Sequence, residues 1–305
     1  MNSIILLQRM TVLFLMILVG VISYRKGVLD DISCAKITTL IVNVLNPMII
    51  ISGVLDTNIE KDIHIMDNLL LVVMMYALLI TLSYLYVKLR RFEIKQARFY
   101  QLMMIFNNVG FIGIPLVRGL YGEKYIIYLV FYILVFNLLA YTLGIYLASK
   151  SSDKEADYSW KNIINMGFLA CLLSLLIFIF RIPVAAPIKD ACKYLGDASI
   201  PLSMLIIGAS VARMSLRELF LQRQLYEFMF VKMLLIPSIC VLIVKQLPVA
   251  DEILGIFLLC VSMPCASIAG MLAQEYGGRG TEGNHLIAFT TVFSLLTVPI
   301  ISLLL

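Results

Sequence analysis

Charged residues are scarce in this chain: they make up 14% of its 305 residues, whereas hydrophobic residues make up 61%. A soluble domain carries about a quarter of its residues as charged ones, so the composition excludes an ordinary soluble protein. It indicates a polytopic membrane protein, with the lipid bilayer covering most of its surface. The net charge of +5 is therefore not the mark of a nucleic-acid partner.

The groupings of residues that catalysis or metal binding requires are also missing. The six cysteines contain no CxxC pair and no metal-ligand spacing, and there are only two histidines. This pattern excludes a zinc site and a disulfide framework. Because no nucleophile, base and acid recur together at helical spacing, we predict no catalytic residue, no metal and no cofactor, and hence no enzyme.

Acidic residues are absent from the middle of the apolar stretches. Asp197, Glu227 and Glu275 all lie near the ends of such stretches. A proton-coupled carrier often relays its proton through a buried carboxylate, so this absence disfavours proton coupling. Sodium coupling stays open, because backbone carbonyls at a helix break can bind Na⁺.

The apolar stretches leave room for ten membrane-spanning helices of ~20 residues. Because Arg25 and Lys26 follow the first stretch instead of preceding it, we expect an uncleaved first span. The predicted spans are residues 6–24, 33–55, 67–88, 98–120, 125–148, 161–180, 194–213, 224–246, 252–275 and 284–304.

Lysine and arginine are distributed unequally between the predicted loops. The loops after odd-numbered spans hold roughly twice as many as the loops on the other side. By the positive-inside rule, the odd loops face the cytoplasm and both termini lie outside the cell membrane.

Prolines recur at a spacing close to half the chain. Pro47 and Pro201 are separated by 201 − 47 = 154 residues, and Pro115 and Pro264 by 264 − 115 = 149. A repeat of five spans must insert its second copy upside down, which gives an inverted repeat. We predict a first repeat over residues 1–148, a cytoplasmic linker over 149–162 and a second repeat over 163–305.

One stretch, residues 106–117 (FNNVGFIGIPLV), carries two asparagines, two glycines and a proline within an otherwise apolar span. Proline removes a backbone donor and clashes with the preceding turn. We predict that Gly110, Gly113 and Pro115 break the fourth span and that Pro264 breaks the ninth. Each second half-helix would then offer free N–H groups to an anion.

Residues 106–122 resemble the fourth span of the auxin efflux carrier family, which includes the plant PIN carriers. The shared pattern is an Asn, four intervening residues, Gly-Ile-Pro-Leu and later Tyr-Gly, and Asn108 begins it. Four other stretches also resemble the spans of this family. They are Asp197-Ala198 with Gly208 in the seventh span, Lys232 with Pro237 in the eighth, Met263-Pro264 with the Gln274-Glu275-Tyr276 that follows in the ninth, and Asn46-Pro47 in the second.

The resemblance implies an all-α fold of ten spans in two inverted repeats. Spans 1, 2, 6 and 7 would form a scaffold, and spans 3–5 and 8–10 a moving transport domain with broken helices 4 and 9 crossing at its centre. The long central loop of many plant members is missing, and the substrate-contacting residues in spans 2 and 9 differ. Auxin itself is therefore not carried over as the substrate.

The candidate substrate-binding residues are polar side chains near the predicted breaks and in spans 2 and 7, namely Asn108, Asn107, Asn46, Ser203, Ser267 and Cys265. Asn137 is a weaker candidate, since a lone intramembrane Asn often only bonds a neighbouring helix. Lys232 has two alternative interpretations. It extends from a shallower depth toward Glu227, or it is a fixed positive charge that supports the crossing.

We therefore expect a secondary carrier that exports small organic anions, carboxylates in particular, by alternating access. A sodium- or proton-coupled symporter or antiporter and an anion channel are the alternatives. The expected partners are the organic anion and the lipid bilayer, and the sequence leaves a homodimer open.

Overall fold

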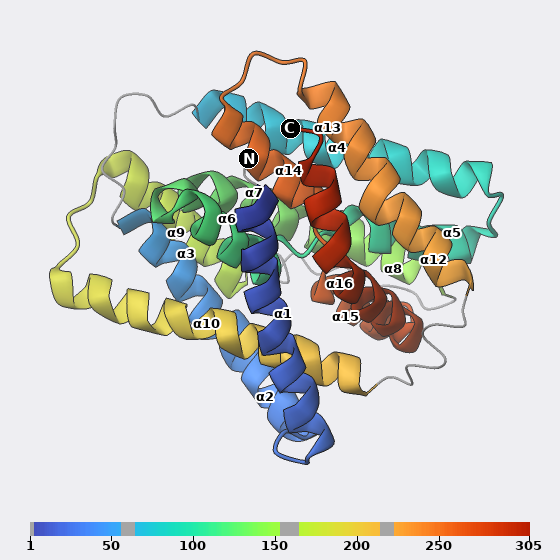
Figure 1. Cartoon of the computed structure of the whole chain (residues 1–305), viewed down its shortest axis with the longest axis horizontal. Helices are drawn as coiled ribbons and strands as arrows, with labels where there is room; N and C mark the ends of the chain where they lie inside the picture. Colours follow the sequence, from blue (N-terminus) through green and yellow to red (C-terminus); the bar gives the residue numbers. More distant parts are fainter. Residues whose placement is uncertain (1–2, 56–64, 153–164, 214–222) are drawn as a thin grey trace.

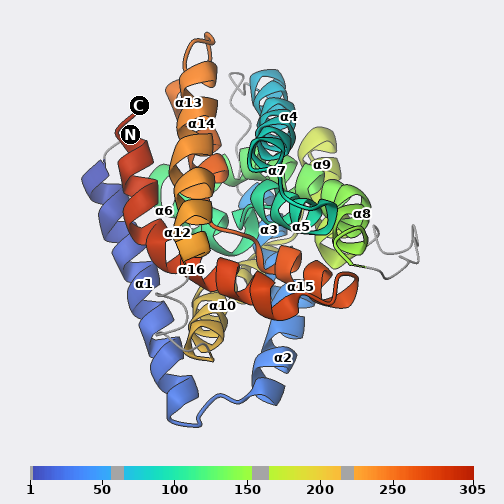
Figure 2. The same cartoon turned by 90° about the vertical axis from the view of Figure 1, so that its right-hand side faces the viewer.

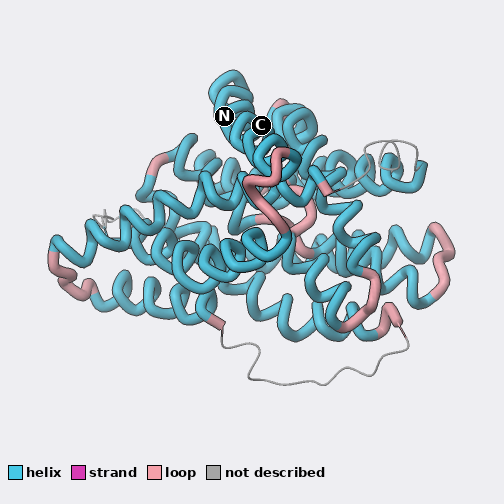
Figure 3. Tube along the Cα trace, turned by 90° about the horizontal axis from the view of Figure 1, so that it is seen from below, coloured by secondary structure: helices cyan, strands magenta, loops and turns pink. Residues whose placement is uncertain are grey.

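The computed structural model describes residues 3–55, 65–152, 165–213 and 223–305, and these form helices joined by short connections (Figures 1 and 3). The described residues contain no β-strand beyond one isolated pair. Seven of the described helices are long and apolar enough to span a membrane. The prediction of an all-α, multi-pass chain is confirmed. Residues 153–162 of the predicted linker lie outside the described residues.

The seven candidate spans are α1 (Ser3–Arg25); α2 (Asp31–Leu40), η1 (Ile41–Leu45) and α3 (Asn46–Leu55), in continuous sequence; α4 (Ile65–Leu89); η3 (Glu123–Tyr125), α7 (Ile126–Leu139), η4 (Ala140–Gly144) and α8 (Ile145–Ser149); α10 (Ala186–Ala212); α12 (Arg223–Phe230), η6 (Val231–Leu235) and α13 (Ile236–Val244); and α16 (Gly280–Ser302). Six of the seven begin and end within about four residues of the predicted ranges, whereas α10 begins 194 − 186 = 8 residues before the predicted start. Helix α9 (Met166–Phe180) is shorter.

Two helices are interrupted inside the protein. The first consists of α5 (Ile94–Ile105), the non-helical residues Phe106–Asn108, η2 (Val109–Gly113) and α6 (Ile114–Tyr121). The second consists of α14 (Asp251–Ser262), a non-helical segment at 263–266 and α15 (Ser267–Glu275). Figure 2 shows α14 running toward the centre of the molecule and α15 turning away from it. Both predicted interruptions are therefore present.

The position of the first break differs from the prediction. It lies at Phe106–Asn108, ahead of Gly110, Gly113 and Pro115, and Pro115 sits inside the helix that follows. The reason is the wide π-helical turn η2, which ends two residues before the proline. A wider turn moves the carbonyl groups away from the ring that would otherwise clash with them.

The same arrangement recurs at two other prolines. The π-turn η1 ends two residues before Pro47, and η6 ends two residues before Pro237. These prolines widen a turn without interrupting the helix. Pro264, by contrast, lies in the non-helical segment of its span, so Pro115 and Pro264 are not structural counterparts.

Helix α1 packs against α10, α10 against α3, and α3 against α9 (Figure 1). The contact between α1 and α10 is made by backbones. A Cβ atom on Gly208 would lie 2.1 Å from the carbonyl oxygen of Ile17, and one on Gly20 would lie 2.3 Å from that of Leu205. Small residues allow such close approach between helices in membranes.

We expect Gly208→Ala to destabilise the protein although alanine is the better helix former. The added methyl group must push α1 and α10 apart, which costs about 1–3 kcal/mol and lowers the thermal midpoint by roughly 5 °C. Gly110→Ala is the matched control, because a Cβ atom there meets nothing within 4 Å. Thermal unfolding in detergent should leave this control at or above wild type. A Gly208→Ala protein as stable as wild type would contradict the proposed packing.

Candidate functional site

The two interrupted helices meet at their breaks. The N–H of Asn108 donates to the carbonyl of Pro264 at 2.8 Å, and the N–H of Ala266 donates to the carbonyl of Phe106 at 2.9 Å. Asn107 and Cys265 pair between these reciprocal bonds in antiparallel fashion. This contact between residues 106–108 and 264–266 is called the crossing. It supplies the backbone partners that a non-helical chain needs inside a membrane.

Asn107 and Lys232 satisfy the carbonyl groups where α5 and α14 end. The amide nitrogen of Asn107 donates to the carbonyls of Cys260 and Val261 at 2.8 and 3.0 Å. Nζ of Lys232 donates to the carbonyl of Met104 at 2.6 Å and to Oδ1 of Asn107. A cation is favourable at a helix C-terminus, where the helix dipole is negative.

The surroundings of Lys232 decide between its two alternatives. Its side chain is 1% exposed and bonds the crossing. Glu227 pairs instead with Arg90, with Nε and Oε1 2.7 Å apart, and accepts from Tyr86. The interpretation that Lys232 extends toward Glu227 is therefore wrong.

A cavity of about 130 Å³ lies beside the crossing. None of the described residues that line it carries a charge. Its polar side chains are those of Asn46, Asn107, Asn108, Asn137, Tyr141, Asn165 and Ser267, and its apolar wall includes Ile50, Phe111, Ile133, Phe136, Ile268 and Met271. The residues that the sequence pointed to in spans 2, 4 and 9 are thus brought together around one space.

Asn108 has the clearest unmet hydrogen-bonding capacity in this cavity. Its Oδ1 accepts from the N–H of Phe111 at 3.2 Å and caps η2. Its Nδ2 is buried and has no partner among the described residues. A buried amide donor without a partner costs about 1–3 kcal/mol, so a ligand that accepts from Nδ2 would recover that energy.

Two helix N-termini also border the cavity, at η2 and at α15. The first N–H groups of a helix have no partner within it. In the described parts of the chain, those of Gly110, Ser267 and Ile268 meet no acceptor. Each N-terminus is equivalent to roughly half a positive charge, so both favour an anion in the cavity.

The remaining predicted residues lie in different positions. Asn46 is half-buried in the cavity wall, and its Oδ1 accepts from Ser199. Ser203 is outside the cavity, in an adjoining crevice, and its hydroxyl has no partner among the described residues. Cys265 does not line the cavity either. Its N–H donates to Oγ1 of Thr290, and its thiol donates to the carbonyl of Met103.

Sequence reasoning missed Asn165 and Tyr141 as lining residues. Asn165 caps α9 by accepting from the N–H of Phe168 at 3.0 Å. An Asn directly before an apolar helix is a recognisable N-cap signal. It could have located the start of α9, although not the cavity beside it.

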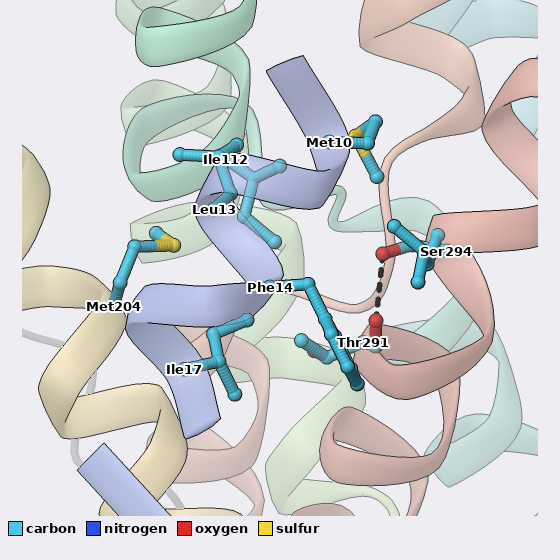
Figure 4. Close-up of a pocket in the computed structure, with 9 residues that line it drawn as sticks. Met10, Leu13, Phe14, Ile17, Ile112, Met204, Thr291 and Ser294 are labelled. Atoms are coloured by element: carbon cyan, nitrogen blue, oxygen red, sulfur yellow. Dashed lines mark hydrogen bonds between the residues drawn. The ribbon is translucent and has the colours of Figure 1, made fainter. Parts of the chain in front are cut away.

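A second cavity lies between α1, α10 and α16, with Ile112 from η2 at its edge (Figure 4). Its volume of about 10 Å³ holds at most one water molecule. Ser294 donates to the carbonyl of Thr291 at 2.7 Å within it. It is too small to hold an organic ligand in this conformation.

Comparisons with known proteins identify the family of this chain. The model of the membrane transport protein family matches residues 5–302, and the chain belongs to this family, that of the auxin efflux carriers. The resemblance drawn from residues 106–122 is confirmed. An uncharacterized transporter of Methanothermobacter thermautotrophicus is 24% identical over 294 residues, which cover 95% of each chain.

Proposed function

We propose that this transporter is a secondary carrier of small organic anions, and that the carboxylate group of its substrate binds at Asn108. The observation that carries the proposal is that one uncharged cavity brings together the unpartnered Nδ2 of Asn108 and two helix N-termini. Backbone N–H groups and an amide bind a carboxylate without a buried cation in direct contact.

The walls of the cavity favour one carboxylate over two. Nδ2 of Asn108 and the N-termini of η2 and α15 lie at the crossing, whereas the rest of the wall mixes isolated polar side chains with apolar ones such as Ile133 and Phe136. A second carboxylate would lie along this mixed wall, away from both helix N-termini, and burial there is costly for a charge. A monocarboxylate with an aromatic or aliphatic body therefore suits the cavity better than a small dicarboxylate such as malate or malonate.

The crossing also bears on ion coupling. The carbonyls of Met104, Phe106, Cys260, Val261 and Pro264 all accept hydrogen bonds from the protein. The breaks therefore offer few free oxygens to a sodium ion, which prefers such carbonyls. Uncoupled export fits better, because an inside-negative potential expels an anion with ~2.3 kcal/mol per charge per 100 mV.

The movement we propose is alternating access between two units. The scaffold would be α1, α2–α3, α9 and α10, and the transport domain would contain the crossing. The pairing of Asn107 with Cys265 gives an offset of 265 − 107 = 158 residues, close to half of the 305 residues of the chain. This agreement supports ten spans in two inverted repeats, with the termini outside the cell membrane.

A thermal-shift series on the purified protein tests the proposed ligand class. Benzoate is expected to raise the thermal midpoint, since a ligand at 100 times its Kd adds about 2.7 kcal/mol of stability. Benzamide, of the same shape without the charge, should give no shift, and malonate a smaller one. A shift from benzamide as large as that from benzoate would rule out anion recognition.

Transport itself distinguishes a carrier from a channel. In liposomes preloaded with benzoate, external labelled benzoate should accumulate by saturable counterflow. Single-channel currents carried by benzoate, without counterflow, would favour the anion channel instead.

A further inference from the structure

A crevice adjoins the cavity between α3, η2, α6 and α10. Asn46, Gly110, Phe111 and Ile114 line both the cavity and the crevice. The rest of the crevice comes from α3, from α10 and from Pro115 of α6, and its polar members are Ser199 and Ser203. In this conformation it has essentially no room for a water molecule.

Two features of the crevice are unusual for tightly packed helices. The hydroxyl of Ser203 is buried and unpartnered among the described residues. Ser199 bonds Asn46, a residue of the cavity wall. A hydroxyl buried without a hydrogen-bond partner is costly. The unpartnered hydroxyl of Ser203 is explained if the crevice opens to a polar ligand in another conformation.

An ion-pair cluster follows the crevice residues along α6 and α10. Arg118, one turn beyond Pro115 on α6, pairs with Asp197 on α10 and with Glu123, whose Oε1 lies 2.5 Å from Nη2 of Arg118. Lys193, also on α10, lies 3.8 Å from Glu123. Two ion pairs, Arg118–Asp197 and Glu123–Lys193, thus join the α6–η3 segment to α10.

We infer that the crevice at Ser199 and Ser203 is the closed outer half of the transport route, and that the Arg118–Asp197 pair is the latch that holds it shut. This inference rests on the proposed alternating-access function. The two ion pairs connect α10, a scaffold helix, to the segment that would move. When the segment moves, the serine hydroxyls and Arg118 become available to the departing carboxylate.

Chemical labelling of a cysteine at position 203 tests the latch. The six native cysteines are buried, so Ser203→Cys adds one reporter in a low background. An anionic, membrane-impermeant methanethiosulfonate is applied to the outside of intact cells. We expect slow labelling with the latch intact and at least a fivefold faster rate when Asp197→Asn is added.

Asp190→Asn is the matched control, because it removes an exposed carboxylate from the same helix. It should leave the labelling rate unchanged. Arg118→Lys, which keeps the charge but loses the contact to two carboxylates at once, should give an intermediate rate. It also serves as the test if Asp197→Asn fails to fold, as judged by size-exclusion chromatography.

The inference would be overturned if Ser203→Cys alone were labelled as fast as Ser203→Cys combined with Asp197→Asn and with Arg118→Lys, both of them folded. Fast external labelling with the latch intact would overturn it too, since the crevice would then already be open. Benzoate is not added in this experiment, and the readout is a labelling rate at position 203. A failed thermal shift with benzoate would therefore count against the proposed substrate and leave the latch result independent.

Discussion

Lys232→Met is expected to weaken benzoate binding about thirtyfold while leaving the protein folded. Nζ of Lys232 bonds Asn107, the neighbour of Asn108, and so places a full positive charge near the cavity. At a separation of roughly 8 Å and an effective dielectric constant of about 20, that charge contributes about 2 kcal/mol to an anion's binding. Titration of the purified variant measures the Kd.

The stability of this variant should change less than its affinity. Losing two hydrogen bonds from a charged donor costs about 1.5–3 kcal/mol each. Removing a lysine from the middle of a membrane helix makes the insertion of that helix into the membrane more favourable by ~2.5–3.5 kcal/mol. The two effects largely cancel, so the thermal midpoint without ligand should fall by only a few degrees.

Lys245→Met is the matched control for Lys232→Met. Lys245 follows α13 in the same span, is exposed, and donates to the carbonyl of Leu304. Its removal should leave the Kd for benzoate unchanged. If Lys232→Met is folded and binds benzoate as tightly as wild type, the charge serves only the crossing.

The general plan of the site could be predicted from local sequence because its signals are local. Asparagines and prolines inside apolar stretches mark places where a membrane helix needs extra partners. This reasoning located both interrupted spans and selected Asn108, Asn46 and Ser267, which line the cavity. The choice did not require knowledge of the three-dimensional packing.

The details that failed depend on contacts between distant residues. Whether Pro115 breaks a helix or follows a π-turn is decided by the packing around it. The partners of Asn107 at Cys260 and Val261 are 153 and 154 residues away. The local sequence allowed Asn107 to satisfy broken backbone, but it could not show which carbonyl groups it bonds. Asn165 and Tyr141 reach the cavity from helices whose positions the sequence pattern does not fix.

Asn108 should prove the most sensitive position for ligand binding. A hydrogen bond to a charged group contributes about 1.5–3 kcal/mol, so loss of the Nδ2 donor should raise the Kd for benzoate roughly tenfold to a hundredfold. Asn108→Ala also removes the cap on η2, which costs about 0.5–2 kcal/mol of stability. The two effects must be separated to assign the role of this residue.

Asn108→Ser and Asn108→Asp make that separation, because both keep an oxygen that accepts from the N–H of Phe111. Both should retain the thermal midpoint of the unliganded protein. The serine variant should lose most of its benzoate-induced shift, and the aspartate variant should lose all of it, since its charge repels the carboxylate. A full shift in Asn108→Ser would show that Nδ2 does not contact the ligand, and the anion would then have to be held by the helix N-termini alone.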